Sequence, residues 1–461
     1  MIDLKNVENY RENNRIEAKK ALGGLPKSLW ETYSAFANTY GGVILLGVRE
    51  EADKSLHPVR LPNPERLLEE FWEIINDKSK VSVNILSQNH VEIVGAGENR
   101  FISIHVPRAS RLDKPVFIGV DPFLGSYRRT GEGDYRCNAE EVKSMLRDAT
   151  KVAEDLRPIP DADLRALEKS SVRLYRDAVL KNRPQSSLAQ LSEEAFLTKI
   201  GVLALDDKGK VRPTKAGLLM LGQWKKLKEF FPNYRLVFET RLNEEKVKKE
   251  YRENLYTFFI RVQEAFQKTL LEETALSAGI EALTNCLVNA DYKAKSGIYV
   301  TNKKSGLSFS NPGGFRMSVE EAKSGGVSDP RNLGLLRLFH YVGMGTGTGS
   351  GIPNIFANWY KNGRGIPIIR ESFHPERVNV ILPYAMDTAR KNLFKTKAGR
   401  LSFGEEEKRV IIEFITERIS ATVGEVSSTL HLSSTETKNI LDSLLEDGVL
   451  KKEGNVYALK S

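Results

Sequence analysis

Five glycines occupy every second position of the segment GMGTGTGSGIPN, which begins at Gly343 and is followed by an apparent helix. Glycine loses the most conformational freedom on folding, so such a run indicates a slack loop or a surface that something approaches closely. Backbone N–H groups without side chains can converge on phosphate oxygens, and a helix start adds partial positive charge. The run matches neither the P-loop spacing nor the G-x-G-x-x-G spacing. We therefore examine it as another kind of phosphate-binding loop, with these glycines as candidates: Gly345, Gly347, Gly349 and Gly351.

A polar helix face precedes this loop in the sequence. In EALTNCLVNADY, the residues Glu281, Asn285 and Asn289 are four apart, so on a helix they share one face. A glutamate and an asparagine one turn apart can serve one water molecule and one metal ion. The strand GIYVT, the turn NKKSG, the strand LSFS and the segment NPGG follow in that order.

This order of segments resembles the nucleotide-binding fold shared by gyrase, Hsp90, histidine kinases and MutL, known as the GHKL or Bergerat fold. The resemblance covers roughly residues 236–385 and implies bound ATP with Mg²⁺. It implies that Asn285 helps to hold the metal ion, that Glu281 polarises an attacking water, and that Asn289 lines the site. Asn311, followed by Gly313 and Gly314, would meet the adenine edge, and the glycine run would form the lid over the phosphates.

The sequence departs from the family's usual pattern at three points. Asparagine stands at position 311, where these ATPases usually have aspartate. The segment Asn289–Tyr292 reads Asn-Ala-Asp-Tyr, where bacterial relatives commonly have His-Arg-Asp-Tyr, and no catalytic lysine is evident. These departures leave open a weak ATPase, ATP binding without turnover, and a degenerate nucleotide fold.

Two glutamates near the N-terminus are a second candidate for chemistry. Glu12, Glu17 and Lys19 form an E-x-x-x-x-E-x-K pattern. On one regular helix the two glutamates would point about 140° apart, so they converge only if this segment is extended or broken. Further along, Tyr127, Arg128 and Arg129 combine a stacking surface with phosphate contacts.

Three segments in order resemble the Schlafen AlbA-like domain, over about residues 8–148. They are the E-x-x-x-x-E-x-K pattern, SAFANTYGGVILLGV, and GSYRRTGEGDY from Gly125. In Schlafens with RNase activity, two glutamates and an acidic residue after the Gly-Val strand form a metal-dependent nuclease site. The resemblance therefore implies Mg²⁺ or Mn²⁺ at Glu12, Glu17 and Glu50, where metal-bound water attacks a phosphodiester. Lys19 would contact a phosphate, and we add Lys20 to the nucleic-acid contacts. Nucleic-acid binding without cleavage is the alternative.

Composition places these candidates in a soluble, multidomain chain. With 461 residues, about three domains are expected. The net charge of +9 suggests an anionic partner such as nucleic acid. Two cysteines cannot form a disulfide framework, the polar N-terminus is no signal peptide, and the apolar runs are too short to cross a bilayer. We expect a cytoplasmic protein with no membrane partner that forms a homo-oligomer.

The elements that must position the candidates divide the chain into α/β and α+β domains. We expect a Schlafen AlbA-like domain at 1–150, with strands at VILLGV, HVEIVGAG, FISIHVP and PVFIGV. A helical connector at 151–235 and a GHKL-like domain at 236–385 follow. Residues 386–402 are expected to be a basic linker, because they lack apolar periodicity.

The last segment, 403–461, reads as three helices and a hairpin, which is the pattern of a winged helix-turn-helix. It is the second candidate nucleic-acid surface, through Lys438, Lys451 and Lys452. Glu436, Asp442, Glu446 and Asp447 surround Lys438 in the sequence and oppose binding to a phosphate-rich groove.

Three functions remain open from the sequence. The first is an ATP-binding, nucleic-acid-binding regulator, such as a transcriptional regulator. The second is a metal-dependent Schlafen-type endoribonuclease acting on tRNA or other RNA, for example in phage defence. The third is an interaction scaffold with a degenerate nucleotide fold. The sequence alone does not decide between DNA and RNA.

Overall fold

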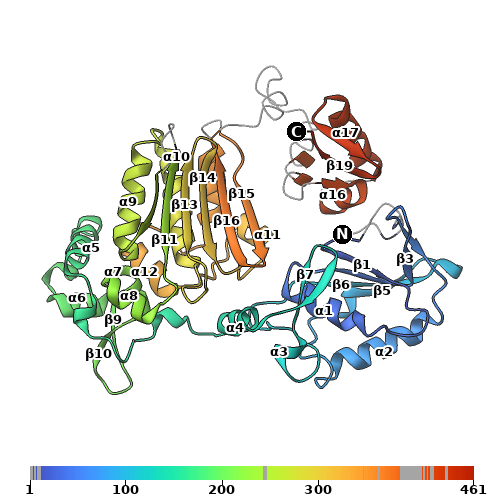
Figure 1. Ribbon diagram of the computed structural model, residues 1–461, viewed down its shortest axis with the longest axis horizontal. Helices are drawn as coiled ribbons and strands as arrows, with labels where there is room; N and C mark the ends of the chain where they lie inside the picture. The colour runs from blue at the N-terminus through green and yellow to red at the C-terminus, as the bar shows by residue number, and fades with distance from the viewer. Residues whose placement is uncertain are drawn as a thin grey trace. The chain divides into compact units, whose positions relative to one another are not determined.

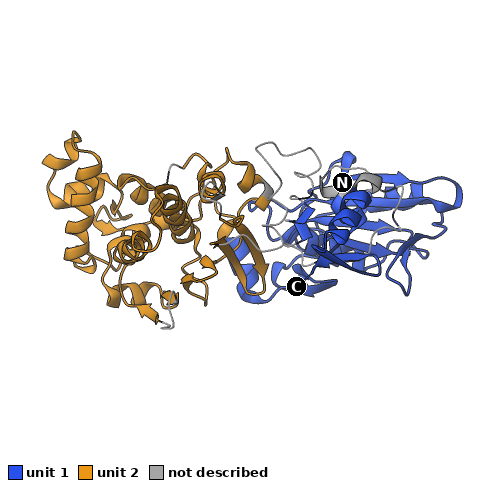
Figure 2. Cartoon of the chain, turned by 90° about the horizontal axis from the view of Figure 1, so that it is seen from above, with its two compact units in different colours: residues 1–146, 387–461 blue, residues 147–386 orange. Residues whose placement is uncertain are grey.

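The computed structural model describes residues 4, 7, 12–241, 247–345, 347–360, 364–384, 408, 411–412, 414–415, 420–430 and 434–460. The chain forms two compact units, one of residues 1–146 with 387–461 and one of residues 147–386 (Figure 2). The whole of the expected linker, residues 386–402, lies outside the described residues. Within the described part of the chain, no helix is long and apolar enough to cross a membrane.

The N-terminal part of the first unit is built on a four-stranded sheet (Figure 1). Its strand order is β1 (Ile16–Lys19), β2 (Gly42–Leu46), β6 (Phe101–Val106) and β5 (Val91–Val94). β1 and β2 are parallel, and β6 is antiparallel to both of its neighbours. Two ribbons accompany the sheet: β3 (Val48–Glu50) with β4 (Leu56–Pro58), and β7 (Tyr127–Thr130) with β8 (Gly133–Arg136). The helices are α1 (Ser28–Asn38), α2 (Pro64–Asn76), α3 (Pro122–Gly125), α4 (Ala139–Asp148), η2 (Gln88–His90) and η3 (Gly97–Asn99).

The apolar run GVILL forms β2 because this strand is buried on both faces. Ile44 and Leu46 pack with α1, α2, β5 and β6 in one core, and Leu45 packs in a second core on the other face. A strand buried on both faces needs a continuous apolar run rather than an alternating one. Gly42 is required at its start, because an added Cβ would lie 2.7 Å from the Phe36 ring.

One strand predicted from the sequence does not form. The segment PVFIGV, residues 115–120, makes only isolated bridges, from Ile118 to Val81 and from Phe117 to Ser126. Side chains satisfy its backbone instead: the N–H of Val116 donates to Asn38 (2.8 Å), and that of Phe117 donates to Ser82 (2.9 Å). Pattern alone could not show this, because the partners lie far away in the sequence.

The C-terminal part of this unit has its own small core. Its described elements are β17 (Ser420–Thr422), α16 (Val423–Leu430), α17 (Ser434–Glu446), β18 (Leu450–Glu453) and β19 (Val456–Leu459). The strands form a sheet in the order β17-β19-β18, and β18 and β19 are the hairpin expected from LKKEGNVYAL. Ile411, Ile415, Leu441 and Tyr457 belong to the core.

The second unit contains a six-stranded sheet (Figure 1). Its order is β12 (Val247–Tyr251), β11 (Leu236–Arg241), β13 (Ile298–Lys303), β14 (Gly306–Pro312), β16 (Glu376–Pro383) and β15 (Ile368–Phe373). β11 and β13 are parallel, and the other neighbouring pairs are antiparallel. Alternate residues of β13 and β16 are buried, as expected when helices cover one face. These helices are α9 (Leu255–Gln267), α10 (Glu273–Asn289), α11 (Val319–Ser324), α12 (Leu333–Tyr341) and α13 (Gly351–Tyr360).

The helical connector shares one continuous core with this sheet and its helices. The connector consists of η4 (Glu154–Leu156), η5 (Leu164–Ala166), α5 (Lys169–Asn182), η6 (Ser187–Gln190), α6 (Glu193–Lys199), β9 (Leu203–Leu205), β10 (Val211–Pro213), α7 (Lys215–Leu221) and α8 (Trp224–Phe230). Buried hydrogen bonds join the two regions: the Tyr175 hydroxyl donates to the Leu338 carbonyl (2.6 Å), and the Asn254 amide donates to the Ser171 hydroxyl (2.8 Å).

Candidate functional site

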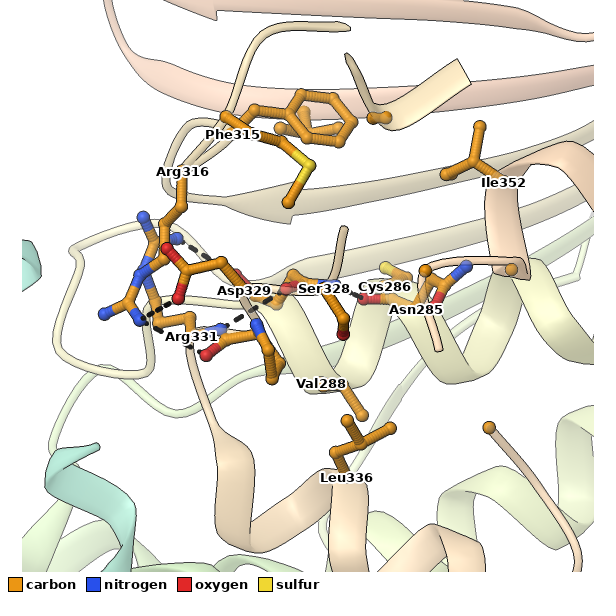
Figure 3. Close-up of a pocket in the computed structure, with 18 of the residues that line it drawn as sticks. Asn285, Cys286, Val288, Phe315, Arg316, Ser328, Asp329, Arg331, Leu336 and Ile352 are labelled. Atoms are coloured by element: carbon orange, nitrogen blue, oxygen red, sulfur yellow. Dashed lines mark hydrogen bonds and ion pairs between the residues drawn. The ribbon is translucent and has the colours of Figure 1, made fainter. Parts of the chain in front are cut away.

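A cavity that is partly open to solvent lies beside α10 (Figure 3). Glu281, Asn285 and Asn289 all line it, as expected for residues four apart on one helical face. On the opposite face, Leu283 and Leu287 are fully buried in the core. The hydrophobic side of α10 thus fixes its polar side toward the cavity.

The glycine run lines another wall of this cavity. Gly345, Gly347 and Gly349 have φ values of +68°, +71° and +78°, a backbone conformation that side chains disfavour. An added Cβ on Gly349 would lie 2.3 Å from the carbonyl oxygen of Val327. The alternation of glycines therefore has a conformational cause. Thr346, inside the run, lies outside the described residues.

The last glycine of the run holds α13 close to the polar face of α10. Gly351 is the first residue of α13, and its added Cβ would lie 2.6 Å from Oε1 of Glu281 and 3.0 Å from Nδ2 of Asn285. The positive end of a ten-residue helix thus lies beside a glutamate and an asparagine. A phosphate group with a hard cation fits these neighbours, because N–H donors meet the anion and side-chain oxygens meet the cation.

The NPGG segment closes the cavity from the end of β14. Asn311 is 3% exposed, lines the cavity, and has its Nδ2 3.3 Å from the Pro312 carbonyl oxygen. Gly313 has φ of +89°, and an added Cβ there would overlap the guanidinium group of Arg331. Gly314 also lines the cavity, and its added Cβ would lie 2.6 Å from Oε1 of Glu371.

Apolar side chains supply the rest of the lining. In the view of Figure 3, Phe315 and Ile352 lie above Asn285 and Leu336 lies below it. Such a cavity, with apolar walls, one polar helix face and a glycine-rich rim, suits a ligand with both a flat apolar part and an anionic part. Among the cavity's ionisable groups, burial raises the pKa of Glu281, as is common for a proton acceptor in a site.

Two arginines of the cavity were not predicted from the sequence. Arg331 is 8% exposed and pairs with Asp148, the last residue of α4, with its Nε 3.0 Å from Oδ1. Arg316 donates to the same Oδ1 at 3.2 Å. Burial alone would raise the pKa of Asp148, but Arg331 and Arg316 outweigh it and hold that pKa at about 2. The partners are more than 160 residues apart, so no local pattern reveals them.

The N-terminal glutamates approach one another in the first unit. Glu17 lies on β1, so the segment is extended, and Glu50 ends β3. Burial raises the pKa of Glu12, and the nearby charges of Glu17 and Glu50 raise it further, against a hydrogen bond from Ala18. One oxygen of Glu12 accepts from the Ala18 N–H at 2.9 Å. Oε1 of Glu50 is buried without a hydrogen-bond partner.

Protein cations already bind the central glutamate of this group. The Glu17 carboxylate is 2.8 Å from Lys19 Nζ at one oxygen and 2.8 Å from Arg129 at the other. Arg129 also pairs with Asp134, 3.0 Å away, whose second oxygen accepts from Thr32. Within the described ranges, no three His, Cys, Asp or Glu side chains are arranged to hold a metal ion.

The predicted nucleic-acid contacts differ in their access to solvent. Lys20 is exposed, but Arg129 is 1% exposed and Tyr127 is buried with its hydroxyl on Glu31. Alternate residues of β7 are buried, so Tyr127 and Arg129 both point inward. The prediction that these two residues touch nucleic acid does not fit these positions. Arg128 pairs with Glu141 of α4 (3.0 Å) and lies over the ring of Tyr135, an exposed aromatic residue that we had not predicted.

In the C-terminal part, the three predicted lysines are exposed among acidic neighbours. Lys438 lies on α17, and Lys451 pairs with Glu453 at 3.0 Å on the hairpin. Lys452 lies over the ring of Tyr457. Asp442 on α17 accepts from the Tyr457 hydroxyl, so one of the acidic residues has a structural role.

Comparison with known families divides the chain in three. Residues 12–138 match the family described as "Schlafen, AlbA_2". Residues 297–382 match "Putative ATP-dependent DNA helicase recG C-terminal", and residues 143–237 match "Domain of unknown function (DUF8451)". The chain thus contains a Schlafen AlbA_2 domain and a RecG-like ATPase-type domain, and the resemblance to Schlafen proteins is confirmed at this level. These matches suggest a nucleic-acid-related, nucleotide-binding protein.

Similar solved structures include the following two. A crystal structure of the DIP2311 protein from Corynebacterium diphtheriae has 16% identity and a TM-score of 0.42, and the match covers 97% of this chain and 80% of that one. A solution structure of the N-terminal domain of a RecG-related helicase protein from Nitrosomonas europaea has 29% identity and a TM-score of 0.22. That match covers 29% of this chain and 90% of the other. No curated protein matches in sequence.

Proposed function

We propose that this chain is an ATP-binding regulatory protein that binds nucleic acid, for example a transcriptional regulator. One observation carries the proposal: three separate segments of the second unit, with Glu281, Asn285, Asn311 and the glycine run, line a single cavity. The match of residues 297–382 to a RecG-type family supports a nucleotide as the ligand.

In this proposal the second unit is a divergent GHKL-type fold. Phosphates contact the glycine run and the start of α13, and the adenine approaches Asn311 and Gly314. A bound Mg²⁺ would neutralise phosphate charge, held by Asn285 with support from Asn289. Glu281, which also lines the cavity, would accept a proton from water.

Nucleic acid is the partner of the first unit in this proposal. Lys20, Arg128 and the exposed Tyr135 offer phosphate and stacking contacts on the Schlafen AlbA_2 domain. We also propose that residues 403–461 form a winged helix with Lys438, Lys451 and Lys452 as secondary contacts. A cytoplasmic location and a homo-oligomeric assembly complete the proposal.

Thermal unfolding with and without ATP and Mg²⁺ tests the nucleotide site. Saturation at 100 times the Kd should stabilise the wild type by about 2.7 kcal/mol. Asn285→Ala should lose this gain, whereas Lys438→Ala, in the other unit, should keep it. No stabilisation of the wild type at millimolar ATP would refute the proposal.

A metal-dependent endonuclease is a second candidate, favoured by the buried, unpaired Oε1 of Glu50 near Glu12. The donor set fits a divalent ion in part, because Lys19 and Arg129 occupy both oxygens of Glu17. Because both oxygens of Glu17 are already paired with protein cations, we prefer nucleic-acid binding without cleavage. Labelled tRNA and duplex DNA, incubated with Mn²⁺, should stay intact; cleavage by the wild type that Glu17→Gln abolishes would establish the nuclease instead.

A further inference from the structure

The helix α4 carries an ion pair at each end, and these two pairs belong to different sites. Glu141, in its first turn, pairs with Arg128 of β7. Asp148, its last residue, pairs with Arg331 and Arg316 of the nucleotide cavity. The boundary between the two compact units falls inside this helix, between Leu146 and Arg147. One helix therefore connects the proposed nucleic-acid surface to the proposed nucleotide site along the chain.

At the first end, Glu141 neutralises Arg128, a residue of the proposed nucleic-acid surface. Nε of Arg128 lies 3.0 Å from Oε1 of Glu141, and the two side chains are only 14% and 15% exposed. The guanidinium group also donates to the Thr130 hydroxyl at 2.6 Å. Any movement of Glu141 changes the charge that β7 presents.

At the other end, Arg331 links Asp148 to the cavity wall. It donates to the carbonyl oxygens of Asn289 (2.9 Å) and Gly314 (3.2 Å), two residues that line the cavity. Next to Asp148, Arg147 pairs with Asp291 at 2.6 Å, two residues beyond the polar face of α10. A ligand that shifts Asn289 or Gly314 would therefore disturb the hydrogen bonds of Arg331, the partner of Asp148.

The start of α4, in the first unit, is capped by side chains. Asn138 accepts hydrogen bonds from the N–H groups of Glu140 (2.9 Å) and Glu141 (3.1 Å), and Glu141 accepts one from the N–H of Asn138 (2.7 Å). This reciprocal pattern is a capping box, which stabilises a helix start. Val142 is fully buried.

We propose that α4 couples the two sites, so that nucleotide in the cavity changes the affinity of the Schlafen AlbA_2 domain for nucleic acid. The proposal rests on the proposed function, since it needs both ligands. Coupling between two binding sites is reciprocal: each ligand changes the affinity of the other by the same factor. We expect a factor of about 10, within the range of ~5–150 usual for coupled sites.

The test measures a fluorescent DNA duplex, and tRNA as a second probe, binding to the full chain with and without ATP and Mg²⁺. ATP affinity is measured with and without nucleic acid, and the two factors should agree. The measurements compare the wild type with three variants.

Two of them, called the link variants, interrupt the connection through α4. Asp148→Asn removes the charge at one end. The double variant Lys143→Gly with Leu146→Gly weakens the helix and keeps both ion-paired residues, so it serves if Asp148→Asn folds poorly. Glu140→Gln, next to Glu141 on α4 and exposed, is the control.

The proposal predicts that both link variants bind each ligand alone and lose the coupling, while the control keeps the tenfold factor. It is overturned if the wild type binds both ligands without mutual effect, or if the folded link variants couple as the wild type does. In both cases the proposed function survives. If ATP fails to bind at all, the proposed function falls and the coupling falls with it, and this outcome is distinguishable because nucleotide binding is measured separately.

Discussion

At the scale of single residues, buried charge pairs fix both candidate sites. Arg331 is bound to Asp148 in the second unit, and Arg129 is bound to Glu17 and Asp134 in the first. Arginine suits these positions, because its planar group stays charged and can serve several oxygen acceptors at once. Removing one partner of such a pair leaves the other charge buried and uncompensated.

Asp148→Asn should therefore destabilise the protein by about 3–5 kcal/mol at pH 7, measured by urea unfolding. The pKa of Asp148 is held at about 2, below its ordinary 3.8, so its stabilisation is present above about pH 4 and is lost as the pH falls toward 2. The difference in the free energy of unfolding between the wild type and Asp148→Asn should therefore become smaller as the pH falls over that range. Asp163→Asn, which breaks an exposed pair with Arg165, should change little. If both variants lost the same free energy of unfolding at every pH, the proposed stabilising role of the Asp148 charge would be wrong.

Gly351→Ala should abolish ATP binding with little effect on folding. Its backbone conformation tolerates alanine, but the new Cβ would meet Glu281 and Asn285 within 3.0 Å and fill the space beside them. Gly23→Ala, where a Cβ meets nothing within 4 Å, is the matched control and should bind as the wild type does. Calorimetric titration with ATP and Mg²⁺ checks this; retained affinity in Gly351→Ala would place the phosphates elsewhere.

Among the elements, α4 supplies the acidic partner of Arg128 on β7. Glu141→Gln removes the negative partner of Arg128 while its amide oxygen can still accept from Asn138, so the cap of α4 persists. We expect tighter binding to nucleic acid. The slope of log K against log salt concentration should steepen by up to ~0.9, the value for one additional phosphate contact. Binding is measured by fluorescence anisotropy between about 50 and 200 mM salt, where the affinity of phosphate contacts changes steeply. An unchanged slope, equal to that of Glu140→Gln, would show that Arg128 does not reach a phosphate.

The elements were easier to predict from the sequence than the contacts between them. Four-residue spacing predicted that Glu281, Asn285 and Asn289 share one face, because helical geometry is local. The burial of Arg129 and Tyr127 could not be predicted, because GSYRRTGEGDY reads equally well as an exposed strand end. Asp148 gave no signal either: its role depends on Arg331, 183 residues away. Residue spacing predicts which side chains share one face of a helix or strand. The residues that contact this face can be distant in the sequence, so they are known only from the fold.

At the scale of the whole molecule, the connector and the sheet of the second unit should behave as one folding unit. They share a continuous core and buried hydrogen bonds, such as Tyr175 to Leu338. A fragment of residues 139–386, from the start of α4, should fold and bind ATP. A fragment of residues 236–385, the boundary expected from the sequence, should expose that core and aggregate. Circular dichroism and gel filtration of both fragments decide this; a stable, ATP-binding 236–385 would show that the connector is dispensable.

In our proposal, ATP occupies the cavity between α10, the NPGG segment and the glycine run. Photolabelling of the full chain with 8-azido-ATP and Mg²⁺, followed by peptide mass spectrometry, tests this position. We expect labelling within residues 311–317, near the adenine, which excess ATP suppresses and Asn285→Ala greatly reduces. Labelling confined to other segments, or labelling that excess ATP does not suppress, would contradict it.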